Sequence, residues 1–409
     1  MRQFENGLVP SLRFPGFVGE WKGKSIGTIA ELTSSKRVYL SDYVEKGIPF
    51  YRGKEITELR QDIEPTEILY ISEEAYYGYK ESFGVPQLDD ILMTAVGTLG
   101  NVLRIKNESP FYFKDGNLIW FRKISESSRF LEILLELKKK DIEKTSIGST
   151  QRALTMVELR KLVFKFPFIE EQEKIGTFLS VVDDKLNLLR KKKSLLEQYK
   201  KAMMQKIFSQ EVRFKDGGKD FGEWEEKTLG EIGKSFIGLT YSPDDVVESN
   251  GTLVLRSSNI QDGVLSFKDN VFVTMEISEK NFVKENDILI CARNGSRDLI
   301  GKSALIKKEN EGAAFGAFMT IYRSEFNDFL FHLFKSPIFL KQVNEHLGAT
   351  INQITTKSLN GFVFPFPTKK EQTKIAQFLT ALDDKIAHVS TQIEKMETWK
   401  KGLLADMFV

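Results

Sequence analysis

The chain reads FPFIEEQEKIGTFLSVVDDKLNLLRKKKSLLEQYKKAMMQKIF over Phe166–Phe208, and 200 residues later it reads FPTKKEQTKIAQFLTALDDKIAHVSTQIEKMETWKKGLLADMF over Phe366–Phe408. The two copies align without a gap. Identical pairs include Phe166/Phe366, Pro167/Pro367, Glu171/Glu371, Gln172/Gln372, Ile175/Ile375, Phe178/Phe378, Asp183/Asp383, Lys200/Lys400 and Phe208/Phe408. A repeat of fixed period indicates two halves built on one structural plan.

The two halves also begin alike. The repeated elements are Arg13-Phe14 with Arg213-Phe214, Gly19-Glu20-Trp21 with Gly222-Glu223-Trp224, and Gly27 with Gly230. Between these borders, residues 30–147 and 233–347 show little identity. One interpretation is ordinary drift around tightly packed helices. The other is that a common frame binds a common partner, while the two inserts bind different targets.

Each repeated segment predicts a long helix, the first over about residues 169–208. Apolar side chains recur at every seventh residue from Ile175 to Met203, and in the second copy from Ile375 to Leu403. Such a stripe indicates an amphipathic helix that must pack on another helix. The other copy is the obvious partner, and packing on its own domain is the alternative. Thr368 followed by Glu371 predicts a capping box.

The inserts predict mixed, strand-rich domains. Apolar runs typical of strands occur at 67–71, 117–121, 287–291 and 318–322, and helical patches follow near 129–140 and 327–346. Strands followed by helices favour the α+β class. The predicted organisation is a strand-rich domain at 1–165, a spacer helix at 166–210, a second domain at 211–365 and a second helix at 366–409.

Composition narrows the class of protein. No run of about 18 apolar residues predicts a membrane span, and the first residues lack the apolar stretch of a signal peptide. Cys291 is the single cysteine, which excludes an internal disulfide and is typical of a reducing cytoplasm. The net charge is only +2, so a DNA-binding chain would need its positive charge gathered on one face, or supplied by partners.

Motifs for catalysis or metal binding are not found. The sequence has no Pro-Pro, which the adenine methyltransferase motif requires, and the segment Gly295–Ser303 has five residues between its glycines where a phosphate-binding loop has four. Three histidines and one cysteine have no metal-ligand spacing. Neighbouring aspartates at 183–184 and 383–384 point apart on a helix, so they cannot converge on one substrate. We therefore predict a non-catalytic chain without a metal.

Polar, cationic and aromatic residues in the inserts are suited to DNA. Arginine pairs with guanine and asparagine with adenine through two hydrogen bonds each, although each such residue taken alone is more often part of a solvated loop. The candidates are Arg52, Lys54, Tyr77, Lys80, Thr98, Asn101, Gln151, Arg152, Arg256, Ser258, Asn259, Arg293, Asn294, Ser296, Arg297 and Asn352.

With these borders and helices, the chain resembles the specificity subunits of type I restriction–modification systems over essentially its whole length. The resemblance rests on the two Arg-Phe to Gly starts, on Gly148-Ser149-Thr150-Gln151 and Gly348-Ala349-Thr350 before each helix, and on the repeated pattern from Phe166 to Asp183. It implies an internal pseudo-twofold repeat, with two target-recognition domains that each read one half of a split DNA sequence. It also implies that the long helices pair as an antiparallel coiled coil and set the spacing of the half-sites.

The resemblance further implies partners and cofactors. Two modification subunits would dock on the repeated frame, carry S-adenosylmethionine and methylate adenine, and restriction subunits would supply ATP- and Mg²⁺-dependent translocation and cleavage. The candidate partner contacts on the frame are Glu171, Gln172, Phe178, Asp183, Glu371, Gln372, Phe378 and Asp383. Two alternatives stay open: a coiled-coil adaptor with two protein-binding domains, and a restriction enzyme with recognition fused to catalysis, against which the missing methylation motif argues.

Overall fold

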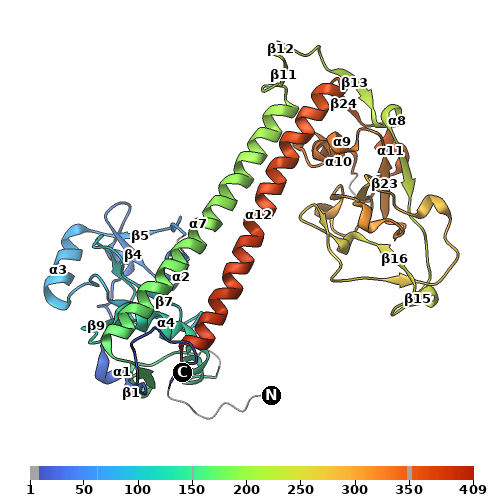
Figure 1. Cartoon of the computed structure of the whole chain (residues 1–409). Coiled ribbons are helices and arrows are strands. Elements are labelled where there is room, and N and C mark those ends of the chain that lie inside the picture. Colours follow the sequence, from blue (N-terminus) through green and yellow to red (C-terminus); the bar gives the residue numbers. More distant parts are fainter. Residues whose placement is uncertain (1–8, 62, 150–151, 348–351) are drawn as a thin grey trace. The chain divides into compact units, whose positions relative to one another are not determined.

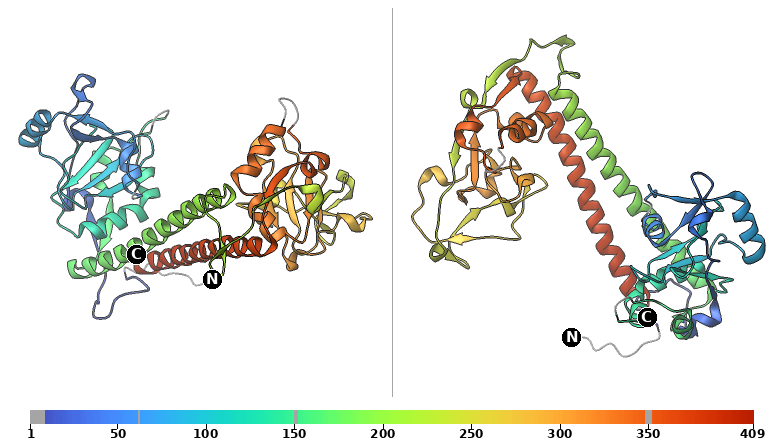
Figure 2. Two further views of the ribbon diagram at one scale, coloured as in Figure 1. Left: turned by 90° about the horizontal axis from the view of Figure 1, so that it is seen from above. Right: turned by 180° about the vertical axis from the view of Figure 1, so that it is seen from behind.

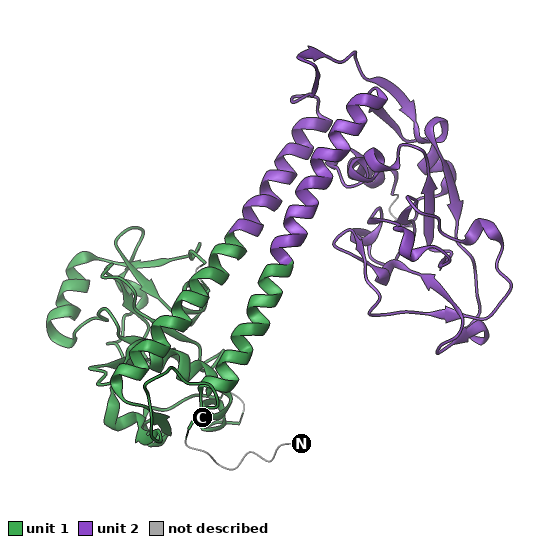
Figure 3. Cartoon of the chain, viewed as in Figure 1, with its two compact units in different colours: residues 1–191, 391–409 green, residues 192–390 purple. Residues whose placement is uncertain are grey.

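The computed structural model describes residues 9–61, 63–149, 152–347 and 352–409. The chain forms two compact units, which are described separately (Figure 3). Unit 1 comprises 1–191 and 391–409, and unit 2 comprises 192–390. Among the described residues, we find no helix whose length and apolarity would let it span a bilayer.

Unit 1 contains two four-stranded sheets and a two-stranded ribbon (Figure 1). Strands β2, β9, β6 and β7 are antiparallel neighbours in that order, and β3, β5, β4 and β8 form the second sheet, in which β4 and β8 are parallel. The strands are β1 Lys22–Ser25, β2 Glu31–Thr33, β3 Tyr43–Val44, β4 Ile48–Tyr51, β5 Leu69–Ile71, β6 Ile91–Thr94, β7 Val102–Arg104, β8 Tyr112–Phe113, β9 Leu118–Arg122 and β10 Val163–Phe166. The short helices are α1 Ile26–Ile29, α2 Gly53–Leu59, α3 Glu73–Phe83, α4 Ser128–Leu137, α5 Lys139–Lys144 and α6 Met156–Lys161.

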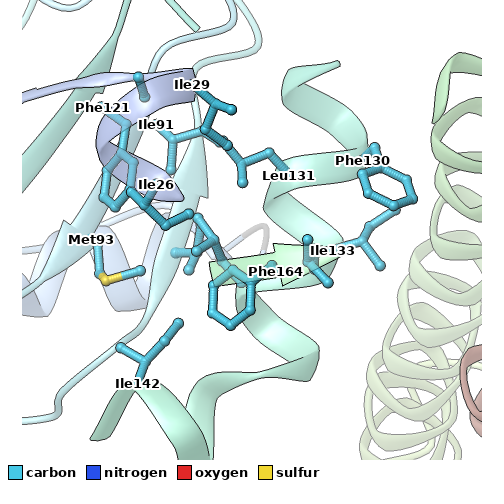
Figure 4. Packing of buried hydrophobic residues seen from close by; sticks show 14 of the residues in the cluster. Ile26, Ile29, Ile91, Met93, Phe121, Phe130, Leu131, Ile133, Ile142 and Phe164 are labelled. Carbon is cyan, nitrogen blue, oxygen red and sulfur yellow. The ribbon is translucent and has the colours of Figure 1, made fainter. Parts of the chain in front are cut away.

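The main core of unit 1 lies between the first sheet and its helices. Ser127 caps α4 by accepting a hydrogen bond from the Phe130 amide. This helix then turns a buried apolar face toward side chains of α1, β6 and β9 (Figure 4). The labelled residues of this core are Ile26, Ile29, Ile91, Met93, Phe121, Phe130, Leu131, Ile133, Ile142 and Phe164. The strand and helix predicted at 117–121 and 129–140 are confirmed, with the helix divided into α4 and α5.

Unit 2 repeats this plan. Its sheets have the orders β14-β23-β20-β21 and β15-β19-β16-β22, with β16 parallel to β22, and β13 pairs with β24 as β1 pairs with β10. The strands are β11 Lys215–Asp216, β12 Lys219–Asp220, β13 Glu225–Thr228, β14 Lys234–Ile237, β15 Val246–Val247, β16 Thr252–Leu255, β17 Ile260–Gln261, β18 Val264–Leu265, β19 Phe272–Val273, β20 Ile288–Cys291, β21 Ser303–Leu305, β22 Ala314–Phe315, β23 Met319–Arg323 and β24 Val363–Phe366. The short helices are α8 Leu229–Ile232, α9 Asn327–Leu333, α10 Pro337–His346 and α11 Thr356–Asn360. The inserts therefore share one fold despite their little sequence identity.

The two predicted long helices are confirmed as α7, Ile169–Phe208, and α12, Lys369–Met407. The apolar residues that recur at every seventh position along these helices are all buried or half-buried. In unit 1, Lys400 of α12 donates to Asp183 of α7, and Arg190 contacts Glu397 at 2.6 Å. In unit 2 the reciprocal pair, Lys200 of α7 and Asp383 of α12, lies 2.5 Å apart. The helix halves in each unit are thus antiparallel neighbours, as both views of Figure 2 show.

Buried arginine–glutamate pairs fasten the start of each half to its long helix. Arg13 donates two hydrogen bonds to Glu171, at 2.7 and 2.6 Å, and Arg213 binds Glu371 in the same way at 3.1 and 2.7 Å. Both carboxylates are fully buried. Trp224 also donates to Glu371. The Glu371 carboxylate, predicted to serve a capping box with Thr368, thus forms this ion pair.

The repeated aromatic residues at the ends of the long helices pack into the cores of the two units. In unit 1, Phe408 at the end of α12 stacks on Phe130 at 5.2 Å and packs edge-on against Trp21. In unit 2, Phe208 at the end of α7 packs against Phe329 at 5.8 Å, and Trp224 contacts that ring as well. Each domain therefore buries the last aromatic residue of the helix that arrives from the other half of the sequence.

The Arg13–Glu171 pair provides a test of this frame. We expect Arg13→Ala to lower the free energy of unfolding of unit 1 by about 3 kcal/mol, because it leaves a fully buried carboxylate without its counter-ion. Denaturant unfolding of the full chain, followed by fluorescence, measures the loss. The control Arg129→Ala removes an exposed arginine with one long contact of 3.4 Å to Thr177 and should change stability by less than about 0.5 kcal/mol. Equal effects of both variants would contradict the assignment.

Candidate nucleic-acid interface

Equivalent loops of the two units carry candidate residues of the interface. In unit 1, the β6–β7 loop lies beside the segment after α5, with β-bridges from Val96 to Ala153 and from Ile147 to Ala153. In unit 2, the β20–β21 loop lies beside the segment before α11, with a bridge from Arg293 to Gln353. The structure therefore places the loop that carries Thr98 beside the segment that carries Arg152 in one unit, and the loop from Arg293 to Ser296 beside Asn352 in the other.

Side-chain amides of asparagine hold the β20–β21 loop of unit 2 in place. Asn294 donates to Ser257 Oγ at 3.1 Å and accepts from the Ser296 amide at 2.9 Å. Asn352 donates to the Gly295 carbonyl at 3.3 Å. Arg293 and Ser296 are exposed. Among these predicted residues, Asn294 and Asn352 thus shape the loop, while Arg293 and Ser296 project from it into solvent.

Arg297 contacts the end of a helix. Its guanidinium donates to the carbonyls of Asn344 and Leu347, at 3.0 and 3.3 Å, where α10 ends. Carbonyls in the last turn of a helix lack partners within the helix, and arginine is a usual donor to them. This arrangement uses part of the guanidinium to anchor the β20–β21 loop to α10.

Two other candidate arginines are engaged with carboxylates. Arg52 binds Glu55 at 2.5 Å, and Arg256 binds Asp269 at 2.9 Å. Each follows an equivalent strand, β4 or β16, and its backbone amide donates to the side chain three residues on, Glu55 or Asn259. The two arginines therefore occupy equivalent positions in the same kind of turn.

Asn101 and Asn259 are buried, which corrects their prediction as base-reading residues. Asn259 is fully inaccessible and donates to the Ser266 and Asp269 carbonyls. Asn101 donates to Thr57 Oγ1 at 2.9 Å and accepts from Lys139 at 2.6 Å. Buried amides must be hydrogen-bonded, and these bonds join Asn101 to α2 and α5 and Asn259 to the segment after β18. The hydroxyl of Ser258 is likewise buried, and among the described residues it has no hydrogen-bond partner, so it is not presented to a base.

The remaining candidates of unit 1 are on the surface. Tyr77 and Lys80 are exposed on α3, and Lys54 forms a solvent-exposed pair with Glu67 at 2.9 Å. Thr98 is exposed at the tip of the β6–β7 loop. Arg152 is exposed and donates to the Glu143 carbonyl at 2.8 Å. Gln151 lies outside the described residues.

The predicted partner contacts on the repeated frame have internal roles. Glu171, Gln172, Glu371 and Gln372 are buried, so the prediction that they contact a partner is corrected. Gln172 accepts from the Ser127 amide and donates to Glu126. Phe178 and Phe378 are half-buried against Phe14 and Phe214, while Asp183 and Asp383 bind the lysines of the opposite helix. The sequence did contain a sign that the two glutamates are paired internally, because Arg13 and Arg213 repeat at the same offset as Glu171 and Glu371.

Unit 2 has a buried polar cluster that sequence reasoning missed. His332 is almost fully buried, its Nε2 lies 3.0 Å from Thr380 Oγ1, and its Nδ1 lies 3.9 Å from Asp383. Burial, the largest cause, lowers the pKa of His332 to about 3, and the nearby Lys200 ammonium also acts to lower it, whereas the Asp383 carboxylate acts to raise it. Burial also lowers the pKa of Lys335 to about 8. The equivalent position on α4 of unit 1 is the apolar Ile133, so this polar cluster distinguishes unit 2.

Comparison with known proteins identifies the family. The model of the type I restriction modification DNA specificity domain matches the chain twice, over residues 19–198 and 222–398. The chain belongs to this family, and the resemblance inferred from its sequence is confirmed. It is 26% identical to the putative type I restriction enzyme MjaX specificity subunit of Methanocaldococcus jannaschii, over 94% of this chain and 92% of that protein. The MjaVIII specificity subunit of the same organism is 26% identical over 69% of this chain and 71% of its own length.

A solved structure has the same fold. The crystal structure of the type I restriction–modification system S subunit from M. genitalium matches with a TM-score of 0.65, covering 98% of this chain and 99% of that chain at 16% sequence identity. The predicted class, α+β strand-rich domains with long helices in an internal repeat, is thereby confirmed.

The buried His332 predicts a pH dependence of stability. Its pKa is about 3 in the folded unit and about 6.5 in an unfolded chain, so the unfolded state binds the proton first. The contribution of neutral His332 to stability is therefore present above pH 6.5 and is lost as pH falls toward 3. The slope approaches about 1.4 kcal/mol per pH unit within that window.

We expect His332→Ile and His332→Gln to remove this part of the slope between pH 6.5 and 5. The first variant matches the residue of unit 1, and the second keeps a polar side chain that does not titrate in this range. Denaturant unfolding of the full chain at several pH values measures the slope. A slope equal to that of the wild type in both variants would refute the assignment.

Proposed function

We propose that this chain reads a two-part DNA sequence within a type I restriction–modification complex and performs no catalysis itself. The family of the chain supports a role in sequence-specific DNA recognition. Each unit would read one half-site through its insert, and α7 and α12 would set the number of base pairs between the half-sites.

The observation that carries this proposal is the contrast between frame and loops. The two units have the same sheet orders and the same Arg–Glu anchors, whereas the side chains on their equivalent loops differ, with Val96 and Thr98 in one and Arg293 and Ser296 in the other. A shared frame with different exposed loops is what reading two different half-sites requires, because base edges are distinguished by the side chains that reach them.

Partner subunits would supply the chemistry. We propose two modification subunits, one for each half of the frame, with S-adenosylmethionine for adenine methylation, and restriction subunits with ATP and Mg²⁺. The near-neutral net charge of +2 supports this division, because partners would then contribute much of the attraction to DNA phosphates. The adaptor alternative is disfavoured by the family match over both halves of the chain.

Methylome sequencing of a host that carries this gene and its modification partner tests the proposal. We expect one new bipartite N6-methyladenine motif, absent when this gene is deleted while the modification gene is kept. No new motif, with the modification subunit expressed and bound to this chain, would refute the proposal and favour the adaptor.

Exchange of inserts tests the assignment of one half-site to each unit. Replacing residues 30–147 with the insert of a relative should change one half of the methylated motif and keep the other, because the frame residues stay in place. The matched exchange of residues 233–347 should change the opposite half. A change of both halves by either exchange would contradict separate recognition by the two units.

A further inference from the structure

Arg293 differs from the other candidate arginines in the partners of its guanidinium. Arg52 and Arg256 bind carboxylates, and Arg152 and Arg297 bind backbone carbonyls. Among the described residues, the Arg293 side chain has no hydrogen-bond acceptor or carboxylate partner. It is exposed, so its five N–H donors remain available to a ligand.

The backbone of Arg293 is fixed on two sides. Its amide donates to the Phe318 carbonyl at 3.0 Å, a carbonyl that also accepts from Ala292. On the other side Arg293 forms a β-bridge with Gln353, and the neighbouring Ile354 amide donates to Ala292 at 2.8 Å. The backbone of Arg293 is therefore held by the end of the central strands β20 and β23 and by the segment before α11, although its side chain is exposed.

The side chain is also supported. The guanidinium carbon of Arg293 lies 5.1 Å from the centre of the Phe318 ring, within the range of a cation–π contact. Phe318 is 55% exposed, so much of this aromatic ring is not buried in the core. A guanidinium that rests on a ring keeps its N–H edge free, because the contact uses its flat face. Phe318 thus limits the rotamers of Arg293 without occupying its donors.

Unit 1 has different residues at the equivalent places. Val96 forms the bridge to Ala153 as Arg293 does to Gln353, and the Asn117 carbonyl accepts from Ala95 as the Phe318 carbonyl accepts from Ala292. Val96 and Asn117 can offer neither a guanidinium nor an aromatic support. The two units therefore share the backbone of this loop and differ in the groups that it presents.

We propose that Arg293 reads a guanine in the half-site of unit 2, with Phe318 as its positioning residue, and that unit 1 has no such contact at the equivalent place. The inference rests on the proposed function and adds one base to it. A guanine presents two acceptors, O6 and N7, on its major-groove edge, and an arginine matches both with parallel N–H donors. Holding the arginine in place lowers the entropy lost when that contact forms.

Selection from a randomised duplex DNA library tests this inference, with the full chain bound to its modification subunits. The wild-type complex should enrich a bipartite motif in which the unit 2 half contains a G·C pair. Arg293→Ala should lower the preference for that pair by about 5- to 150-fold and leave the other half-site unchanged. The other half-site is thus an internal control for folding and assembly.

Variants of Phe318 test the positioning role. Phe318→Ala and Phe318→Leu should weaken the preference for the same G·C pair by about 2- to 5-fold, while Phe318→Tyr, which keeps the ring, should restore it. Because the ring is largely exposed, the stability of all three variants should match that of the wild type. A structural role of Phe318 alone would not lead to loss at one base pair with rescue by tyrosine.

Other outcomes overturn the inference in distinct ways. Equal weakening of all sequences by Arg293→Ala, with full recovery in Arg293→Lys, would make Arg293 a phosphate contact. Loss of a T·A preference in Phe318→Ala would make the ring a direct contact to a thymine methyl group. A unit 2 half-site without a G·C pair would also refute the inference. Failure of the wild-type complex to enrich any motif would instead refute the proposed function.

Discussion

Burial of the carboxylates of Glu171 and Glu371 is the constraint on which the rest of the structure depends. A buried carboxylate is stable only with a well-placed counter-ion, and Arg13 and Arg213 supply it from the start of each half. Each pair therefore forces the first residues of a half to return to the helix that ends its insert. The insert is closed into a loop whose ends are fixed, and its interior can vary without loosening the helix.

The helix pairs extend this constraint. Lys200, Lys400, Asp183 and Asp383 repeat at one offset, and each lysine binds the aspartate of the other helix. These pairs are partly exposed, and exposed ion pairs contribute little stability, so the apolar series beneath them supplies most of the binding energy between the helices. The charges instead favour the antiparallel register in each unit. A parallel arrangement would not bring both lysines to the aspartates that they contact here.

The sequence predicted periodic and repeated features well. The long helices, the strands at 287–291 and 318–322 and the packing of one helix on the other followed from apolar spacing, because burial on one face has a direct sequence signature. The shared fold of the inserts did not. The equivalent aspartates Asp90 and Asp287 have different partners, Trp120 in unit 1 and Arg323 in unit 2, so the identity of a single residue does not reveal the contact that it makes.

The assignment of polar residues was less reliable. Asn101 and Asn259 are of a residue type that can read DNA bases, but both are buried. Glu171 and Gln172 are repeated and polar, as residues of a docking surface would be, but they lie in the interior. An amide or carboxylate has the same sequence appearance in either role, and only its tertiary partners decide between them. The one sequence signal for an internal role is an oppositely charged residue that repeats at the same offset, as Arg13 does with Glu171. Asn101, bound to the unrepeated Thr57 and Lys139, had no such signal.

Internal pairing also limits which arginines can contact DNA. Arg13, Arg104, Arg213 and Arg323 neutralise buried or half-buried carboxylates, so these four guanidinium groups are not available to DNA phosphates. Nonspecific affinity for DNA scales with the number of phosphate contacts, so each internally paired arginine lowers it. An arginine left without an internal acceptor can then affect selectivity more than total affinity.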